Sequence, residues 1–424
     1  MTSKPLLFTL LFLILISIST TAAQGPIDES GEINGAPYRI RVPANWNGGL
    51  LVYAHGYRDK ADHPGEVDNR TADLAPNAAL ADVLLAQGYA LAGSAYRDNG
   101  WEVAGGIQDT RDLTLHFRNT IGRPNRTLLW AFSMGTVIAF DSMERYTDIY
   151  DGSLCACAVG AGATQSWDSA GDLALAYATV FGMPAAWGYY GDVRDDLDFD
   201  TEVLAKLIPE LSTATNFPKF EFLRLVTGTP GRGIQPPPPP SFYPNWVLTD
   251  MFFSLEARAE LERRAGGPIV QNVDRKYLLT DQERAYLNSL GVISPVIDSW
   301  LVTMNANRVV QAPMFSRSYV EQYANYTGKI KQPMLTMHTI IDPLVTVSQQ
   351  YEYRETVRKA GREKPLYQAY TTGNGHCAFT GPQLLTAVAA LDQWVVTGFK
   401  PTKASFPAAL GFDPGFEPPP MNQP

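Results

Sequence analysis

One serine in the chain has the surroundings that a catalytic nucleophile requires, within the segment Ala131-Phe132-Ser133-Met134-Gly135. The apolar residues 127–130 predict a strand ending just before this segment, and residues 136–146 predict a helix just after it. A sharp turn between strand and helix lifts the serine hydroxyl out of the sheet, and small flanking residues let the two elements cross closely. The first small position is usually glycine and is alanine here. We therefore take Ser133 as the candidate nucleophile.

A serine hydroxyl needs a base, and the chain has only five histidines. His376 follows Gly373-Asn374-Gly375, in a loop between the last predicted strand and the last predicted helix. Glycines in this loop permit a turn that points the imidazole at the strand tips, so His376 is the candidate base. The other four have ordinary explanations: His63 in a polar loop, His116 in a helix, His338 in a strand, and His55 at a strand end beside Gly56.

The third catalytic group must fix the imidazole tautomer and stabilise the imidazolium. Asp342 follows the predicted strand 334–337, in Ile340-Ile341-Asp342-Pro343-Leu344-Val345. The alternative is that Asp342-Pro343 only forms a turn. Taken together, the candidates occur in the chain order Ser133, Asp342, His376.

A tetrahedral oxyanion needs two hydrogen-bond donors near the nucleophile. The amide after the serine, that of Met134, is one candidate. The amide of Tyr57, in the loop that begins with His55-Gly56 after an early strand, is the other. For the substrate pocket we name His55, Tyr96, Arg97 and Trp101, since they follow strand ends, although ordinary loop packing would also explain them.

Short apolar strands alternate with helices in the first part of the chain, which predicts βαβ units and a mostly parallel, doubly wound sheet. The alternation stops at about residue 162 and resumes near residue 330. We therefore expect an α/β core formed by 24–161 and 330–400, and a large, mainly helical cap at 162–329. Such an insertion would lie over the carboxyl edge of the sheet, where ligands bind. Residues 401–424 form a proline-rich tail that we expect to be loose.

Composition excludes several function classes. The 43 acidic residues outnumber the 34 basic ones, and the formal charge of -9 argues against nucleic acid as the main partner. Three cysteines are too few for a disulfide scaffold or a cysteine-rich zinc protein.

Residues 1–23 have a basic start, an apolar run and small residues before a cleavage site, which predicts a signal peptide. A single membrane anchor is the alternative, but the apolar run is short for a span. We expect an exported protein, extracellular or periplasmic, with no membrane span after cleavage and an oligomeric state that the sequence leaves open.

These motifs resemble the α/β-hydrolase superfamily, and the resemblance is carried by His55-Gly56, Ala131-x-Ser133-x-Gly135, Asp342-Pro343-Leu344-Val345 and Gly375-His376. The overall pattern is similar to exported bacterial esterases and lipases. The resemblance covers the core and not the cap. It implies an α/β-hydrolase fold, a Ser-His-Asp mechanism with an acyl-enzyme, and no cofactor or metal. The expected function is a serine hydrolase acting on a small-molecule or polymeric carboxylic ester. A serine peptidase on the same fold and a non-catalytic binding protein are the alternatives.

Cys377 directly follows the candidate base, and Cys155 and Cys157 alternate on one face of the strand after the nucleophile helix. In the implied strand order this strand lies near the histidine loop, so a disulfide from Cys157, or from Cys155, to Cys377 would fix that loop. Three buried free thiols are the alternative. Some tannase and feruloyl esterase relatives carry cysteines beside both serine and histidine, and this chain departs from them with Phe132 before Ser133.

Overall fold

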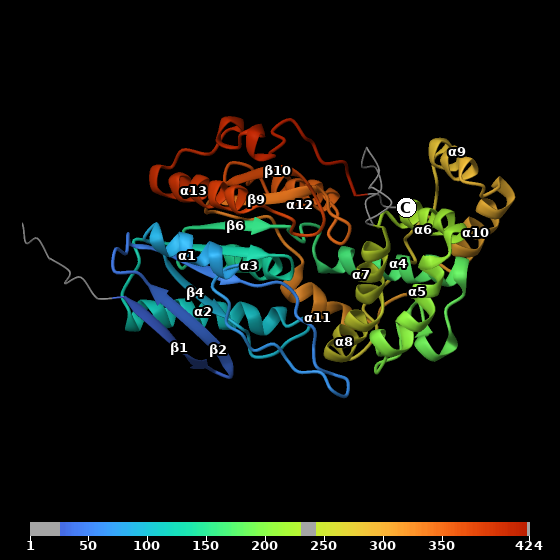
Figure 1. The fold of residues 1–424 in the computed structure, drawn as a ribbon, viewed down its shortest axis with the longest axis horizontal. Helices are drawn as coiled ribbons and strands as arrows, with labels where there is room; N and C mark the ends of the chain where they lie inside the picture. Colours follow the sequence, from blue (N-terminus) through green and yellow to red (C-terminus); the bar gives the residue numbers. More distant parts are fainter. Residues whose placement is uncertain (1–25, 230–242, 422–424) are drawn as a thin grey trace, which may run out of the picture.

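An eight-stranded sheet forms the centre of the protein (Figure 1). This computed structural model describes residues 26–229 and 243–421, so the predicted signal peptide lies outside the described residues. The strand order is β1-β2-β4-β3-β5-β6-β9-β10; the β1–β2 and β2–β4 pairs are antiparallel and the others are parallel. The strands are β1 (Ile27–Ile33), β2 (Ala36–Val42), β3 (Gly49–Ala54), β4 (Ala90–Ser94), β5 (Arg126–Phe132), β6 (Gly152–Ala156), β9 (Met334–Ile341) and β10 (Leu366–Asn374).

The burial of the residues in each strand agrees with the position of that strand in the sheet. In β2, buried Tyr38, Ile40 and Val42 alternate with half-buried neighbours, which is typical of a strand with one covered face. Every residue of β3, β4 and β6 is buried, as expected for parallel strands covered on both faces. The predicted parallel, doubly wound sheet is therefore confirmed.

Helices cover both faces of this sheet (Figure 1). Apolar side chains of α1 and α13 pack with one face, and those of α2, α3 and α12 pack with the other. These helices are α1 (Ala78–Ala86), α2 (Val103–Thr120), α3 (Met134–Arg145), α12 (Ser348–Lys359) and α13 (Gly381–Thr397). The chain passes from β3 to β4 on one side and places β5 on the other, so the winding reverses at the β3–β5 boundary, where open sheets bind ligands.

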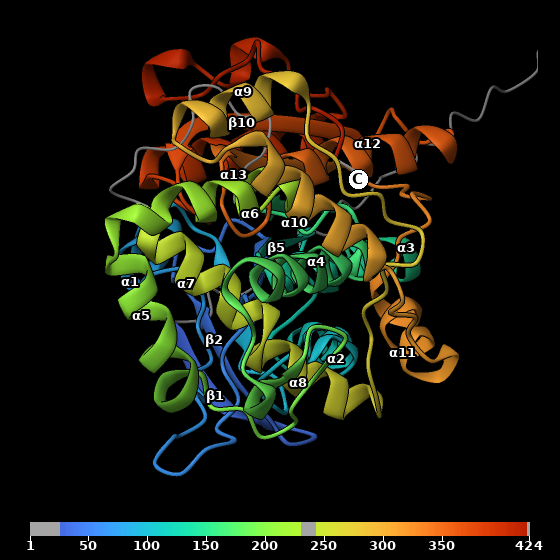
Figure 2. The same cartoon turned by 90° about the vertical axis from the view of Figure 1, so that its right-hand side faces the viewer.

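The chain leaves the sheet after β6 and returns at β9, and the intervening segment is mainly helical. Figure 2 shows its helices lying across the end of the sheet. They enclose an apolar core of their own, distinct from the cores on the sheet faces. The elements are α4 (Ala163–Phe181), the short strands β7 (Gly188–Tyr189) and β8 (Asp192–Val193), α5 (Leu204–Ser212), α6 (Phe217–Thr227), α7 (Tyr243–Ser254), α8 (Glu256–Ala265), α9 (Asp281–Ser289), α10 (Ser294–Ala306) and α11 (Met314–Ala324).

The expectation of a loose tail was wrong for residues 401–421. Phe406 and Phe412 are buried against the sheet, and Phe412 forms a bridge with Thr371 of β10. Phe406 also stacks on Tyr367, with ring centroids 5.1 Å apart. Burial of these aromatic rings outweighs the structure-breaking effect of the surrounding prolines, and the tail returns towards the cap (Figure 1). No helix in the described part of the chain is long and apolar enough to cross a membrane.

Candidate active site

Ser133 occupies the tight turn between β5 and α3. Its backbone has φ 52° and ψ -126°, a conformation that is costly for a non-glycine residue and typical of functional sites. Small residues make the turn possible. A Cβ on Gly135 would lie 2.2 Å from the carbonyl oxygen of Ala54, so only glycine lets α3 approach β3 this closely. The alanine at position 131 is buried in β5.

The other two candidates follow β9 and β10, which pair with each other in the sheet. Asp342 follows β9 and is fully buried; its Oδ1 accepts hydrogen bonds from the amides of Leu344 and Val345, at 3.0 and 2.9 Å. His376 follows β10 in a loop attached to β9, where the amide of Gly375 donates to the carbonyl oxygen of Ile341 at 2.7 Å. The turn that sequence reasoning offered as an alternative for Asp342 is present, and it orients the carboxylate.

The three side chains form a continuous hydrogen-bonded chain. His376 Nδ1 lies 2.8 Å from Asp342 Oδ2, and His376 Nε2 lies 2.7 Å from Ser133 Oγ. An ionised carboxylate can only accept, so Nδ1 carries the proton and donates to Asp342. Nε2 is then the acceptor for the Ser133 hydroxyl, and this tautomer is the one in which the imidazole can remove the serine proton.

None of the other histidines is placed to serve as the base. His338 is buried in β9 with Nε2 4.0 Å from Asp342 Oδ2, and burial lowers its pKa, so it stays neutral. Burial also lowers the pKa of His55, to about 3. His116, on α2, contacts Glu29 and Tyr38, and His63 Nε2 lies 3.8 Å from Glu256 Oε2.

Both predicted oxyanion donors lie beside the serine. Gly56 packs so closely that a Cβ on it would lie 3.2 Å from the Ser133 Cβ, which places the Tyr57 loop next to the nucleophile. Met134 is the first residue of α3, where an amide has no acceptor within its helix. Among the described residues, neither the Tyr57 amide nor the Met134 amide has a protein acceptor. Two free amides beside the nucleophile are what an oxyanion site requires.

A cavity between sheet edge and cap opens onto Ser133. Its empty volume is about 700 Å³, counting the part open to solvent. The walls are mainly apolar and aromatic, as in most small-molecule sites. Residues from the core, cap and tail contribute, among them Tyr57, Trp101, Met134, Trp167, Asp250, Phe253, Leu344, Gln349 and Met421.

Of the four predicted pocket residues, only Trp101 lines this cavity. His55 and Tyr96 are buried in the core and stack on each other, with ring centroids 4.0 Å apart. Arg97 instead pairs with Asp109 of α2 at 2.6 Å. The prediction was wrong for these three because burial and an ion pair satisfy their side chains away from the cavity.

Sequence reasoning did not identify Asp250 or Met421. Asp250 is the only charged residue in α7, so a lone acid in an otherwise uncharged helix was the available signal. Met421 lies in the tail that was expected to be loose, and no local pattern indicated its return to the cavity.

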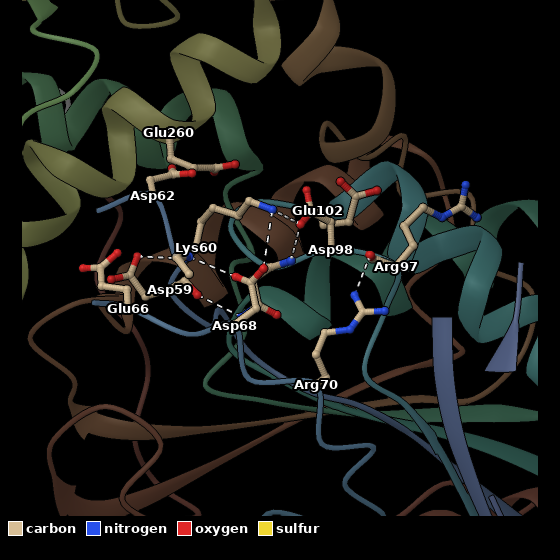
Figure 3. Close-up of polar contacts among 12 residues, drawn as sticks. Asp59, Lys60, Asp62, Glu66, Asp68, Arg70, Arg97, Asp98, Glu102 and Glu260 are labelled. Carbon is tan, nitrogen blue, oxygen red and sulfur yellow. Dashed lines mark hydrogen bonds and ion pairs between the residues drawn. The ribbon is translucent and has the colours of Figure 1, made fainter. Parts of the chain in front are cut away.

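A polar seam joins the cap to the core beside Trp101; it comprises Lys60, Asp98, Glu102, Glu260 and Arg264. Arg264 of α8 pairs with Glu260, Asp98 and Glu102. Figure 3 shows Lys60 between Asp68 and Asp98, on loops of the core. A Glu260 oxygen accepts a hydrogen bond from the amide of Trp101 at 2.9 Å, so this cap helix helps to hold one wall of the cavity.

The predicted disulfide joins Cys157 to Cys377, with the two Cα atoms 5.1 Å apart, and Cys155 is a buried free thiol. The bond links the residue after β6 to the residue after the candidate base. Cys157, His376 and Cys377 lie close together, as the ligands of a metal ion would. Because the two cysteine sulfurs are bonded to each other, they are not available to bind a metal in the oxidised protein. A second group, Asp59, Glu66 and Glu256, consists of carboxylates at the cap–core boundary, and none of them lines the cavity.

Comparison with family models gave no match. A curated protein, an o-phthalyl amidase from Xanthobacter agilis, is 22% identical over 429 residues, which cover 88% of each chain. Among solved structures, an esterase from Aspergillus oryzae has a TM-score of 0.39 and 12% identity, covering 89% of this chain and 80% of that one. Feruloyl esterase B from Aspergillus oryzae has a TM-score of 0.40 and 15% identity, covering 87% and 80%.

The architecture is clear from the chain itself. A mostly parallel eight-stranded sheet carries a strained serine after β5, an aspartate after β9 and a histidine after β10, and a helical cap is inserted after β6. This order of strands and side chains is that of the α/β-hydrolases. The chain therefore has the α/β-hydrolase fold.

Proposed function

We propose that this protein is a secreted serine hydrolase that cleaves carboxylic esters through an acyl-enzyme. Ser133 is the nucleophile, His376 the general base and then general acid, and Asp342 the orienting carboxylate. The observation that carries the proposal is the hydrogen-bonded chain from Asp342 through His376 to Ser133 Oγ, at 2.8 and 2.7 Å. It ends at the cavity that would hold the substrate.

The geometry supports the following steps. Ser133 Oγ attacks the ester carbonyl while His376 Nε2 takes the hydroxyl proton, and the amides of Tyr57 and Met134 stabilise the oxyanion. His376 then gives the proton to the departing alcohol, which leaves an acyl group on Ser133. Water attacks this acyl group with His376 again as base, and the acid product leaves. The buried Asp342 accepts the hydrogen bond from His376 Nδ1 and holds the ring in place in both halves of the reaction.

Amide hydrolysis is a second candidate, and the similarity to an amidase favours it. The same residues would act, with His376 protonating an amine instead of an alcohol.

Export is supported by the apolar N-terminal segment and by the disulfide, because disulfides persist in oxidising compartments.

Hydrolysis of p-nitrophenyl esters and matched p-nitroanilides by the mature protein tests the proposal. We expect ester turnover that Ser133→Ala abolishes, and fluorophosphonate labelling that requires Ser133. Thr136→Ser is a matched control on the same helix. Turnover of anilides above esters would favour the amidase, whereas a folded wild type with neither turnover nor labelling would refute a serine hydrolase.

A further inference from the structure

Asp250, on α7 of the cap, is a buried acid whose carboxyl group has no partner in residues 26–229 and 243–421. Its exposed fraction is 1%, and neither carboxyl oxygen has a hydrogen-bond partner among the described residues. The residue lines the cavity that contains Ser133. A buried carboxyl group with two unsatisfied oxygens costs stability, and such groups in native proteins usually have a functional explanation.

Other buried acids of the cap are paired. Asp168 binds Arg317 at 2.7 Å, and Asp172 accepts a hydrogen bond from Tyr277 at 2.5 Å. These two acids have structural roles that Asp250 lacks. Its position on the cavity wall indicates that the missing partner comes from a bound molecule.

The groups around Asp250 indicate which charge the bound molecule should carry. The nearby charged group is Asp342, and burial together with its negative charge raises the pKa of Asp250 well above the usual range. Two neighbouring carboxyl groups disfavour a further anionic group from a substrate and favour a cationic one. No lysine or arginine lines the cavity in the described part of the chain. Tyr57, Trp101 and Trp167 add aromatic surfaces, which also favour cations.

We propose that Asp250 binds an amino group of the substrate, which makes esters or amides of amine-bearing acids or alcohols the preferred substrates. This inference rests on the proposed function, because the same cavity must hold the scissile carbonyl at Ser133. A substrate that enters as an ammonium displaces the Asp250 proton to solvent, whereas a neutral amine takes that proton directly. Both routes give the same ion pair in the cavity.

Pairs of p-nitrophenyl esters that differ only in the terminal group test this preference. Esters of ω-amino acids with three to six carbons are compared with isosteric esters that carry a methyl group in place of the ammonium. We expect the best amino ester to exceed its isostere about 10- to 100-fold in kcat/KM, the range of a charged hydrogen bond. Asp250→Asn should remove this preference, so that the ratio of kcat/KM for the amino ester to that for its methyl isostere falls to about one, since a neutral amide cannot replace the carboxylate charge.

Asp298→Asn is the matched control, because Asp298 is an exposed cap acid paired with Arg284. A wild type that prefers the methyl esters overturns the proposal, as does an Asp250→Asn enzyme that keeps the amino preference. Equal losses on both esters would show that Asp250 is structural. If Asp250→Asn does not fold, inhibition of the wild type decides: hexylammonium should compete more strongly than 1-hexanol, and the reverse order refutes the ion pair. Failure of the amino preference with methyl-ester turnover intact leaves the proposed hydrolase standing.

Discussion

Removal of the Cys157–Cys377 disulfide should reduce both stability and activity. The two cysteines are 220 residues apart, and the bond closes a loop that includes the whole cap. The chain-entropy relation gives about 18 cal/mol/K for a loop of this length, or about 5 kcal/mol at 25 °C. Measured losses of native disulfides are often smaller than this relation predicts, so we expect a decrease of about 3 to 5 kcal/mol in the free energy of unfolding.

The activity should fall as well, because Cys377 directly follows His376. The hydrogen bond from Gly375 to Ile341 keeps the loop near β9 after reduction, so the base is displaced and not lost. A displacement of about 1 Å can reduce turnover about 100-fold. We therefore expect kcat to fall about 10- to 100-fold with little change in KM.

The assay compares wild type, the Cys157→Ala/Cys377→Ala double variant and the dithiothreitol-reduced wild type. Urea unfolding gives the stability, and p-nitrophenyl ester kinetics give kcat and KM. Cys155→Ala is the control, since it removes the buried free thiol and no cross-link. Unchanged urea midpoints and kcat in both disulfide-free proteins would refute this reasoning.

Three further predictions concern single residues. Asp342→Asn should lower kcat about 10⁴-fold with KM nearly unchanged, because the amide favours the wrong His376 tautomer. Steady-state kinetics measure this loss, and a decrease in kcat of less than tenfold would contradict the prediction. Gly135→Ala should destabilise the protein by about 3 kcal/mol, since the new Cβ would lie 2.2 Å from the Ala54 oxygen. A thermal midpoint equal to that of wild type would show that the close contact between α3 and β3 does not require glycine. Burial raises the pKa of Glu256 to about 7, so its contribution to stability is fully present below its unfolded pKa and is lost as pH rises towards 7. Glu256→Gln should therefore stabilise the protein at pH 8, by about 1 to 2 kcal/mol after solvent screening, and should not stabilise it at pH 4. Equal effects on stability at the two pH values would exclude the burial of Glu256 as the cause.

Local sequence was informative wherever one short segment specifies its own structure. The buried strands β3 and β5 are continuous apolar runs, and the Ala131–Gly135 segment specifies a strand–turn–helix junction. Glycines beside His376 and the proline after Asp342 likewise indicated turns at strand ends. These features place the three candidate catalytic residues, because parallel strands bring their carboxyl ends to one edge.

The cavity wall depended on contacts between distant segments, which local patterns do not encode. Arg97 was expected to face the substrate, but Asp109 on α2 attracts its guanidinium, and this pairing arises only when α2 packs beside β4. Met421 reaches the cavity because Phe406 and Phe412 are buried against the sheet some distance earlier in the chain.

The sequence by itself determined the α/β class, the nucleophile turn, the order of Ser133, Asp342 and His376, and the three thiols available for pairing. Each of these depends on residue type and local spacing, which are properties of the chain before it folds. Only the tertiary structure decided that Cys157 and not Cys155 bonds to Cys377, and that Asp250 lines the cavity with no partner in the described part of the chain. Those outcomes depend on how the cap, the sheet edge and the tail pack together, because burial and pairing are set by neighbours far away in the sequence.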